Sequence, residues 1–359
     1  MTDDRAPSAE DIRAKRADAP KLRDRDFADN LGISEAQLVA AFAGAGAGSG
    51  GRTAVKIDAH PDRIMPAVCT LGTVMALTRN PSCVHEKDGR YENYHPGQHA
   101  AMVLTEDIDL RLFPSHWHHA FLVEVETEGG ARQSIQVFDA AGDAVHKVFL
   151  RDSSDREAWG AARAALALED QSDTIAVAPR QPPEAPRSQP DKADVLRKEW
   201  ARLTDTHQFL RLTSKLKMNR LGAYRIAGAP WVRKLVPGAV DAMLHAVRDA
   251  RIEVMIFVGN RGCIQIHTGP VGVLKPMGPW QNILDPGFNL HLRADHIAEV
   301  WAVHKPTQRG PAVSVEAFDD QGQLIVQVFG VSKEGRDSRP EWDRLVAGLE
   351  TIEEEAAPS

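Results

Sequence analysis

Residues 80–149 of the chain align with residues 260–329 at a constant offset of 180, without a gap. Turn signals and alternating apolar residues coincide along the alignment, and the identical pairs include Cys83 and Cys263, Leu110 and Leu290, Leu112 and Leu292, His116 and His296, Phe138 and Phe318, and Asp139 and Asp319. A repeat of this length predicts two copies of one folding unit. Residues shared by the copies explain the fold. Residues that break the symmetry are the first candidates for function.

The composition is that of a globular protein, with 43% hydrophobic and 26% charged residues in a chain of 359. No apolar run approaches the roughly 18 residues needed to cross a bilayer. The first residues, Met-Thr-Asp-Asp-Arg, lack the apolar stretch of a secretory signal. Three scattered cysteines give neither a disulfide framework nor a structural zinc site. We therefore expect a cytoplasmic protein that is not an integral membrane protein.

The organisation along the chain follows from changes in composition. We expect a disordered arm over residues 1–20, a first repeat over 21–170, a linker over 171–190, a second repeat over 191–350 and a tail over 351–359. The linker contains five prolines and almost no large apolar residues, which is typical of a semi-extended segment. The net charge of −7 argues against nucleic acid as a partner, because sequence-independent binding needs a basic surface.

Each repeat begins with helical patterns and continues with strands. In the second repeat Leu196, Trp200 and Leu203 make one helical stripe; another consists of Val240, Met243, Leu244 and Val247. The following strands are joined by tight turns such as Gly-Asn-Arg-Gly at 259–262, which implies antiparallel pairing. We therefore predict an α+β fold built by tandem duplication, with two large antiparallel sheets that each have flanking helices.

His207 breaks the symmetry, because the corresponding region of the first repeat, residues 25–34, contains no histidine. Asp205 and Gln208 have the spacing of a capping box, which places His207 in the first turn of a helix. The positive end of the helix dipole disfavours imidazolium, so the neutral ring is available as a metal ligand. The same position suits an ordinary surface histidine, and the spacing leaves both interpretations open.

A second asymmetry lies in Asp-Leu-Arg-Leu-Phe at 109–113, where the other repeat has Asn-Leu-His-Leu-Arg. Strand alternation puts Leu110 and Leu112 on one face, and Arg111 and Phe113 on the other. An arginine beside an aromatic residue suits a surface that faces a ligand. An exposed face of a sheet has the same pattern.

Lys305 ends a strand on which Trp301 and Val303 share its face. Met255 and Phe257 share a face of another strand. Basic residues around a pocket lined by aromatic residues and methionine suit a flat apolar ligand that carries carboxylates. Methionine and phenylalanine on strands are also the usual components of a core.

Several runs together resemble one family. They are Val-Gly-Asn-Arg-Gly-Cys-Ile-Gln-Ile-His-Thr-Gly-Pro-Val at 258–271, Phe-Asn-Leu-His-Leu-Arg at 288–293, Val-Trp-Ala-Val-His-Lys-Pro-Thr at 300–307, and the Phe-Asp-x-x-Gly turn before Val-Phe-Gly. The chain resembles the hemin-degrading, or hemin transport, proteins of bacterial heme-uptake operons, the HemS, ChuS, PhuS and HmuS proteins. The resemblance covers nearly the whole chain, duplication included.

The resemblance implies two stacked antiparallel sheets, with one heme bound at the C-terminal half. The axial histidine of the family's Asp-x-His-x-Phe motif falls on His207, and the distal arginine falls on Arg111 with Phe113 beside it. The implied contacts to the porphyrin and its propionates are Arg220, Met255, Phe257, Lys305 and Gln327. This chain departs from the family in two places: His304 stands where arginine is usual before Lys-Pro-Thr, and Ser332 precedes Lys333 where many members have a basic residue.

The resemblance implies heme as ligand or substrate, an inner-membrane heme transporter and an external electron donor as partners, and no other cofactor. With electrons from outside, oxygen would open the porphyrin ring and release iron, while Arg111 would donate hydrogen bonds on the face opposite His207. A heme chaperone that hands heme to a separate oxygenase needs the same ligand and pocket. A heme-free interaction module is the third reading.

Overall fold

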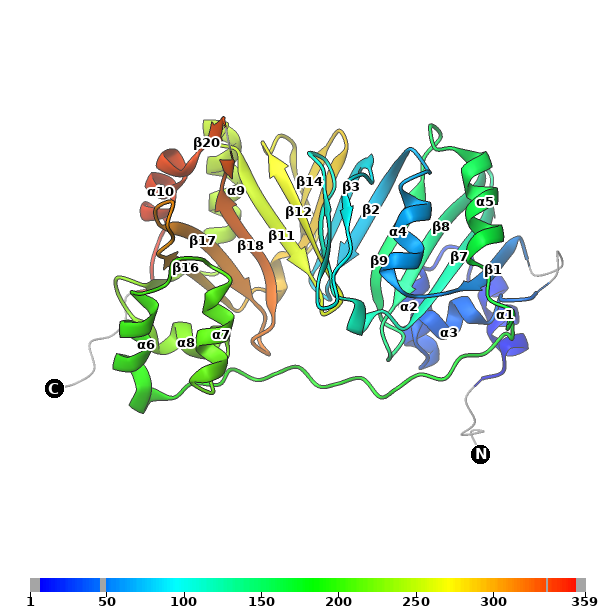
Figure 1. Cartoon of the computed structure of the whole chain (residues 1–359), viewed down its shortest axis with the longest axis horizontal. Coiled ribbons are helices and arrows are strands. Elements are labelled where there is room, and N and C mark those ends of the chain that lie inside the picture. Colours follow the sequence, from blue (N-terminus) through cyan, green and yellow to red (C-terminus); the bar gives the residue numbers. More distant parts are fainter. Residues whose placement is uncertain (1–6, 46–49, 334, 353–359) are drawn as a thin grey trace. The chain divides into compact units, whose positions relative to one another are not determined.

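The computed structural model describes residues 7–45, 50–333 and 335–352 (Figure 1). The chain divides into two compact units. Unit 1 contains residues up to Arg79, residues 86–181 and residues 259–265, while unit 2 contains residues 80–85, residues 182–258 and the chain from Ile266 onward. Each unit therefore incorporates a short segment from the sequence of the other repeat, which the division by composition did not predict.

Unit 1 holds most of the first repeat. Its helices are α1 (Ala9–Asp18), α2 (Asp24–Leu31), α3 (Glu35–Ala40), α4 (Pro61–Val68), α5 (Arg156–Leu166) and the 3-10 helix η1 (Pro114–His116). Its strands are β1 (Arg52–Ile57), β2 (Thr73–Arg79), most of β3 (Cys83–Arg90), β4 (Tyr94–His95), β5 (Ala101–Leu104), β6 (Asp109–Leu112), β7 (His119–Thr127), β8 (Gly130–Phe138) and β9 (Ala144–Leu150).

Unit 2 repeats this plan. Its helices are η2 (Pro190–Lys192), α6 (Ala193–Trp200), α7 (Gln208–Lys215), α8 (Arg220–Ala227), α9 (Ala239–Ala250), η3 (Ala294–His296) and α10 (Arg339–Ala347). Its strands are β10 (Val232–Leu235), β11 (Val254–Gly259), β12 (Cys263–Gly269), β13 (Leu274–Met277), β14 (Trp280–Asp285), β15 (Phe288–Arg293), β16 (Glu299–Lys305), β17 (Ala312–Phe318), β18 (Leu324–Gly330), β19 (Ser332–Lys333) and β20 (Arg336–Asp337), although the ends of β11 and β12 that border their turn cluster with unit 1.

The strand order is duplicated as well. Unit 1 has the antiparallel order β1-β7-β8-β9-β2, and unit 2 has the order β10-β16-β17-β18-β11. The register shifts at the same place in both, between Val137 and Phe138 and between Ala317 and Phe318. A shared bulge is a designed feature of a fold, not a chance irregularity. The predicted α+β duplication with large antiparallel sheets and flanking helices is confirmed.

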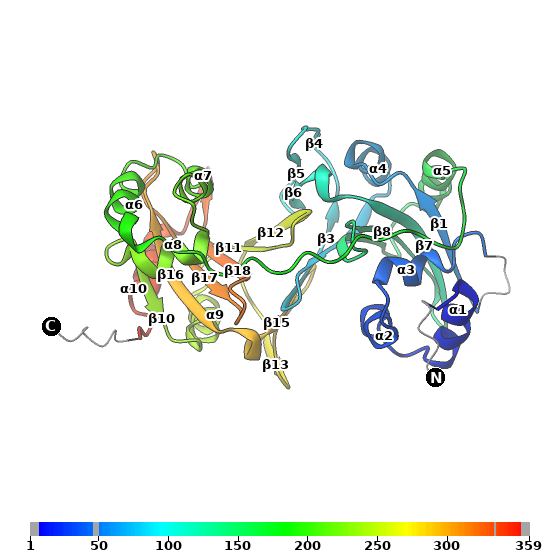
Figure 2. The ribbon, with the colours of Figure 1, turned by 90° about the horizontal axis from the view of Figure 1, so that it is seen from below.

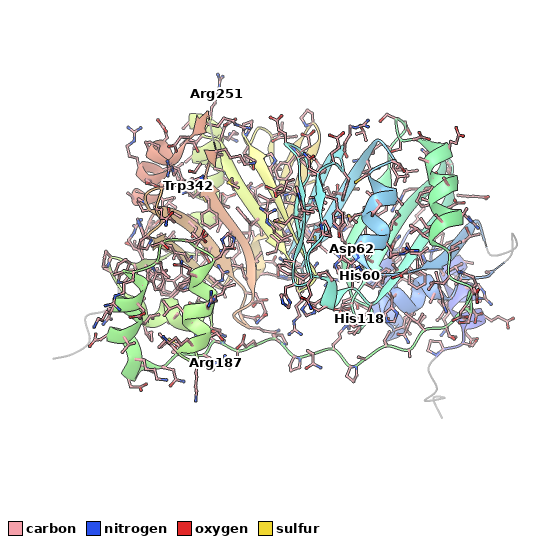
Figure 3. All side chains as sticks on the ribbon, in the orientation of Figure 1. His60, Asp62, His118, Arg187, Arg251 and Trp342 are labelled. Atoms are coloured by element: carbon pink, nitrogen blue, oxygen red, sulfur yellow. The ribbon has the colours of Figure 1, made fainter. Side chains whose placement is uncertain are left out.

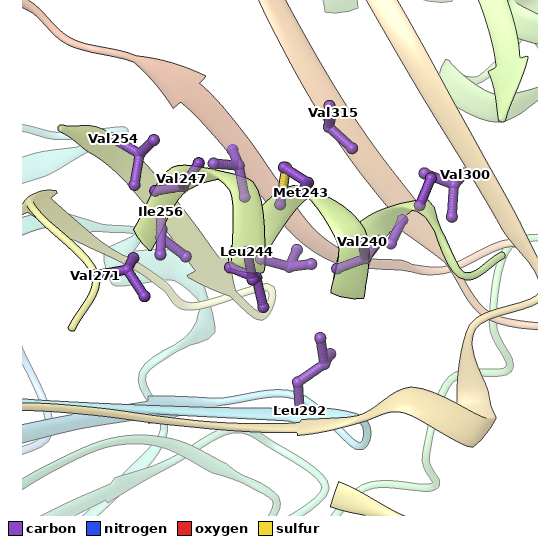
Figure 4. Close-up of a cluster of buried hydrophobic side chains, with 14 of the residues drawn as sticks. Val240, Met243, Leu244, Val247, Val254, Ile256, Val271, Leu292, Val300 and Val315 are labelled. Atoms are coloured by element: carbon purple, nitrogen blue, oxygen red, sulfur yellow. The ribbon is translucent and has the colours of Figure 1, made fainter. Parts of the chain in front are cut away.

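Strand alternation gives the sheet of unit 2 two apolar faces. Val300 and Ala302 of β16 face α9 and α10, while Trp301 and Val303 face α6, α7 and α8. Figure 2 shows these three helices on one side of β16–β18 and α9 on the other. The predicted stripe of α9 packs on the first face, where Figure 4 shows Val240, Met243, Leu244 and Val247 near Val254, Ile256, Val300 and Val315. On α10, Trp342 is fully buried (Figure 3).

The N-terminal arm differs from the expectation for residues 1–20. Ser8 caps helix α1 and forms a reciprocal capping box with Asp11. Ala9 and Ile12 of this helix are buried in the cluster that covers β7. An amphipathic helix with one buried side is stabilised by packing, which the charged, Ala-rich composition did not reveal. Most of the tail predicted over 351–359 lies outside the described residues.

Residues 171–189 of the predicted linker form neither helix nor strand. It is nevertheless attached at several points. Lys56 Nζ donates to Ser172 Oγ at 2.6 Å and to the Thr174 carbonyl at 2.9 Å. Among the described residues no helix is long and apolar enough to cross a membrane.

Candidate functional site

The residues predicted from β11 and β18 lie in register on one face of unit 2. Phe257 is paired with Gln327, and Gln327 with Glu316 of β17. One step along the ladder on the same face, Met255 is paired with Phe329. Opposed residues of an antiparallel ladder point to the same side of the sheet. Alternation along one strand predicted that Met255 and Phe257 share a face. The pairing shows that Gln327 lies on the same face, between Phe257 and Glu316.

These side chains form a half-buried surface, which we call the apolar platform and define as Met255, Phe257, Gln327 and Phe329. The rings of Phe257 and Phe329 lie edge to face, with centroids 5.3 Å apart. The platform continues the face that α6, α7 and α8 cover over β16 and β17. A half-exposed aromatic surface beside a helical layer suits contact with a flat apolar molecule.

A buried ionic cluster lies beside the platform and is centred on Glu316. The Glu316 carboxylate is fully buried and accepts four hydrogen bonds. Lys305 Nζ and Ser314 Oγ donate to Oε1 at 2.9 and 2.8 Å, while Arg220 Nη1 and Tyr224 Oη donate to Oε2, both at 2.9 Å. A buried carboxylate with every lone pair used is a fixed charge, because moving it would leave several groups without partners.

The pKa shifts agree with this arrangement. Burial alone would raise the pKa of Glu316, but the Lys305 ammonium and the Arg220 guanidinium outweigh it and hold that pKa well below its ordinary value. Burial lowers the pKa of Lys305, although Glu316 opposes the shift. Burial and the neighbouring carboxylate both raise the pKa of Tyr224. Tyr224 is therefore a neutral donor between charged groups.

Lys305, which we predicted among the basic residues around a pocket, is buried. It is 3% exposed, and its ammonium also donates to Tyr224 Oη at 2.9 Å and lies 5.0 Å from the centre of the Phe209 ring. Arg220 keeps 22% of its side chain exposed while it holds Glu316. Of the two predicted basic residues, Arg220 is therefore the one that reaches the surface.

His207 is the N-cap residue of α7, one position earlier than the predicted first turn. The expected capping box does not form, because Asp205 Oδ1 accepts the backbone N–H of His207 at 2.7 Å, and Gln208 bonds Thr204. The same Asp205 oxygen lies 2.7 Å from His207 Nδ1. These hydrogen bonds, the backbone one first, hold the pKa of Asp205 below its ordinary value.

The contact with Asp205 selects one tautomer of His207. When Nδ1 carries the proton and donates it to the carboxylate, Nε2 keeps its lone pair. The side chain is 91% exposed, so this nitrogen is accessible. Metal-binding histidines generally have such a second partner, which orients the ring and makes it more basic.

Phe209, two residues after His207, anchors α7. It is buried, and its ring centre lies 4.5 Å from that of Trp200 and 5.5 Å from that of Tyr224. Within the segment from Asp205 to Phe209, His207 is therefore exposed and Phe209 is buried. The Phe209 ring contacts Lys305, so it anchors the start of α7, and His207 with it, beside the ionic cluster.

Arg111 and Phe113 belong to unit 1. Leu110 and Leu112 are fully buried, whereas Arg111 and Phe113 are half-buried, as alternation predicted. The Arg111 guanidinium is held by the Asp109 carboxylate and the Leu110 carbonyl. Asp109 therefore orients the one arginine of β6.

Of the two departures from the family pattern, His304 lies away from the apolar platform. His304 alternates with Lys305 along β16 and so points to the opposite face, on the side of α10, where burial lowers its pKa and Asp343 partly opposes the shift. Lys333 is exposed on the short strand β19, paired with Arg336 of β20. His304 therefore leaves the platform and the ionic cluster unchanged.

Sequence reasoning missed Glu316, Tyr224, Phe329 and the role of Asp205. A signal existed for Glu316, because the first repeat has Gln136 at the corresponding position. For Tyr224 the signal is its spacing from Arg220, four residues along one helix, which places both side chains on one face. Within the described residues no group of three or more His, Cys, Asp or Glu side chains forms a separate metal site.

Comparison with known proteins gives concordant matches over nearly the whole chain. The family model described as "Haemin-degrading HemS.ChuX domain" matches twice, at residues 32–166 and 217–349. The hemin transport protein HmuS of Yersinia pestis is 36% identical over 339 residues, covering 94% of this chain and 95% of that protein. The hemin transport protein HemS of Yersinia enterocolitica is also 36% identical, over 336 residues, covering 93% of this chain and 94% of that one.

Solved structures match equally widely. The crystal structure of holo-PhuS, a heme-binding protein from Pseudomonas aeruginosa, has a TM-score of 0.89 and 41% identity, covering 96% of this chain and 98% of that chain. The structure of ChuS, described as an E. coli heme oxygenase, has a TM-score of 0.82 and 33% identity, covering 94% of this chain and 99% of that chain.

Proposed function

The chain belongs to the haemin-degrading HemS.ChuX domain family, and from this membership we propose that it binds one heme on unit 2 through His207. We further propose that it promotes oxidative degradation of that heme with release of iron, as a cytoplasmic protein of bacterial heme uptake. Heme is the substrate in this reading. An inner-membrane heme transporter would supply it, and an external donor would supply electrons.

The observation that carries the proposal is the pair formed by His207 and Asp205. An exposed imidazole with Nδ1 held by a carboxylate offers Nε2 as a ligand of fixed orientation. Imidazole is a common axial ligand of heme iron, and a carboxylate partner strengthens it as a donor. The donor set on this helix therefore fits heme.

The remaining residues of unit 2 support a porphyrin as the ligand. The apolar platform offers Met255, Phe257 and Phe329 to a flat apolar ring, and Gln327 adds a polar contact. Arg220 offers a partly exposed guanidinium to a carboxylate at the edge of the ring. Lys305 belongs to the same charged group, although its ammonium is occupied by Glu316 and Tyr224.

A heme chaperone is the second candidate, because the relatives' own descriptions divide between the two roles. ChuS is described as a heme oxygenase, whereas HmuS is described as a hemin transport protein. Both roles require the same ligand and the same pocket. In the degradation reading, the residues of this chain bind and orient the heme, and the chemistry of ring opening is supplied by the heme with oxygen and external electrons.

Hemin titration tests the binding proposal. The purified protein is expected to bind one hemin with a shifted Soret band, and His207→Ala is expected to lose the native axial spectrum while keeping its fold, because the side chain is exposed. His245→Ala is the matched control, since His245 is also exposed and paired with an aspartate, Asp241. A wild-type spectrum in His207→Ala would disprove His207 as the ligand. Two hemin sites of equal affinity would disprove the inference that residues unique to the second repeat mark the site.

Reduction in air then separates the two functions. The loaded protein is mixed with a reductant, and the decay of the Soret band is followed together with released iron and carbon monoxide. Loss of the band with both products supports degradation. A stable band, with transfer of heme to an added oxygenase, supports the chaperone. If the protein binds no hemin, the remaining hypothesis is that it is a heme-free interaction module.

A further inference from the structure

A polar network is enclosed in the core of unit 1. His146 of β9 is buried, and each of its ring nitrogens lies within hydrogen-bond distance of a hydroxyl group: Nδ1 is 2.8 Å from Thr78 Oγ1, and Nε2 is 2.7 Å from Tyr91 Oη. The Thr78 hydroxyl also lies 3.3 Å from Cys263 Sγ. We call these four side chains the His146 network. Three of them belong to the first repeat, whereas Cys263 enters unit 1 with the segment of residues 259–265.

The second repeat has apolar side chains at the equivalent positions. Thr78, Tyr91 and His146 correspond to three valines, which belong to the same buried cluster of unit 2 as Cys83, the equivalent of Cys263: Val258, Val271 and Val326. Each unit therefore encloses a segment that carries a buried cysteine. Unit 2 surrounds its cysteine with an apolar core, so the fold itself does not require the polar groups of unit 1 at these positions.

The network satisfies a neutral His146 ring but not a protonated one. A hydroxyl group can donate or accept, so Thr78 and Tyr91 match either neutral tautomer. A buried imidazolium ion needs an anionic partner. The titratable groups that face the ring are Tyr91, Cys263 on β12 and, beside Tyr91, Cys69 at the end of α4. Burial raises the pKa of all three, that of Cys263 to about 12, so they stay neutral at and below physiological pH.

The pH dependence of unit 1 follows from this mismatch. Burial lowers the pKa of His146 from its ordinary value of 6.5 to about 3. Above pH 6.5 the ring is neutral in the folded and unfolded chain, so it has no effect on stability. Below pH 6.5 the unfolded chain binds a proton that the folded chain does not bind until about pH 3. Across this window the unfolding equilibrium constant therefore rises by up to about tenfold for each pH unit.

From this geometry we propose that the His146 network is a pH-sensitive latch, which holds residues 259–265 in the core of unit 1 while the ring is neutral and opens when the ring is protonated. The segment is fixed at two neighbouring residues, because Trp117 Nε1 donates to the Gly262 carbonyl at 2.9 Å beside the Cys263 contact. It begins at the last residue of β11, so the latch fixes the end of the strand that carries Met255 and Phe257. The inference concerns the apoprotein and does not depend on heme binding.

Thiol labelling of the intact apoprotein tests the latch. Cys263 and Cys83 are both fully buried, and each lies in an exchanged segment, so Cys83 is an internal reference for Cys263. A pyridyl disulfide is added at several pH values between 7.5 and 4.5, and the labelled peptides are quantified by mass spectrometry. The ratio of the two labelling rates cancels the pH dependence of the reagent. Since the buried His85 lies in the same segment as Cys83, the ratio is compared between proteins that share His85.

Two variants of the network remove the titrating ring. His146→Gln keeps a neutral polar side chain in its place. Between pH 7.5 and pH 4.5 we expect the ratio of Cys263 to Cys83 labelling to rise about 10- to 100-fold more in the wild type than in this variant. A triple variant, Thr78→Val with Tyr91→Phe and His146→Val, makes the core apolar as in unit 2. It should behave like His146→Gln, and it keeps the test decisive if glutamine disturbs the fold.

The control is His118→Gln, because His118 is an exposed histidine of the same unit, and it should match the wild type. Urea unfolding of each apoprotein gives a second measurement. Relative to the network variants, the wild type should take up about one additional proton on unfolding between pH 6 and pH 4. The same pH dependence of the labelling ratio in the wild type and both network variants would overturn the latch. Loss of the rise in His118→Gln would overturn it as well, because the effect would then not come from His146.

Discussion

At the scale of single residues, the orientation of Arg111 is set by its neighbour Asp109. The carboxylate holds the guanidinium at Nη1, and the Leu110 carbonyl accepts from the same nitrogen. With 31% of the side chain exposed, the remaining donors are accessible. Arg111 is therefore oriented in advance, which is the condition under which a donor stabilises developing charge most effectively.

Arg111→Ala should separate degradation from transport. We expect hemin to keep its His207 spectrum, while ring opening driven by a reductant slows by about tenfold or more because an oriented donor is lost. Release of iron and carbon monoxide is the measurement. Arg90→Ala is the control, because Arg90 is an exposed arginine of the same unit paired with Glu92. An unchanged rate in Arg111→Ala would contradict the role, and a wild-type protein that releases neither product would support the chaperone.

How far the sequence predicts single residues depends on where their partners lie. His207 and Asp205 are two positions apart, so their contact is local, although the spacing was interpreted as a capping box between Asp205 and Gln208. Lys305 was predicted among the basic residues around a pocket. Its ammonium instead donates to Glu316, which lies on the next strand. Register between strands comes from the fold, because pairing depends on turns and bulges far from the residues concerned. Long-range ion pairs are therefore hidden from a reading along the chain.

At the scale of elements, the end of the linker is part of the structure around α8. Asn219, the N-cap of this helix, accepts from the Arg187 backbone N–H at 2.9 Å and donates to the Ala185 carbonyl at 2.8 Å. Ser188 Oγ donates to the Gly222 carbonyl at 2.8 Å. Figure 3 marks Arg187 beside this helical layer. The proline content predicted an extended segment but gave no sign of this attachment, which depends on side chains distant in the sequence such as Asn219.

Gly222 allows the linker to approach α8. A Cβ atom at this position would collide with the backbone of Arg187. We therefore expect Gly222→Ala to cost about 1–3 kcal/mol of unfolding free energy, despite the better helix propensity of alanine. Gly160→Ala is the matched control, because Gly160 lies within α5 with open space around its Cβ direction, and it should gain roughly 0.5–1 kcal/mol. Urea unfolding measures both, and equal effects would contradict the close packing.

At the scale of the whole molecule, the duplication was readable from the sequence but the exchange of segments was not. Residues 259–265 enter unit 1, where Asn260 Nδ2 donates to the Arg79 and Val145 carbonyls at 2.9 and 2.8 Å. Residues 80–85 enter unit 2, where Asn80 Nδ2 donates to the Ile325 carbonyl at 2.8 Å. The two asparagines are 180 positions apart and equivalent. An alignment shows equivalent residues, whereas it carries no information on which unit each segment joins.

The exchanged segments are built into the cores of the units that receive them. Cys263 is fully buried in unit 1, with Sγ 3.3 Å from Thr78 Oγ1, and the same hydroxyl lies 2.8 Å from His146 Nδ1. Burial lowers the pKa of His146 to about 3, so the ring is neutral at physiological pH. Trp117 Nε1 donates to the Gly262 carbonyl at 2.9 Å. Removing the segment would take away the acceptor of the buried Trp117 Nε1 and the side chain of Cys263 from this core, and both losses are costly.

Cutting the linker should therefore not separate the two parts of the chain. With a protease site inserted between Gln181 and Pro182, where unit 1 passes into unit 2, we expect the two fragments to elute together in size-exclusion chromatography after cleavage. Each fragment contributes a segment to the core of the other unit. The fragments should therefore stay associated through these buried segments after the covalent link is cut. The uncut protein with the same insertion is the control, and urea should dissociate only the cut form into two peaks. Elution as separate folded fragments without urea would show that each repeat completes its own core.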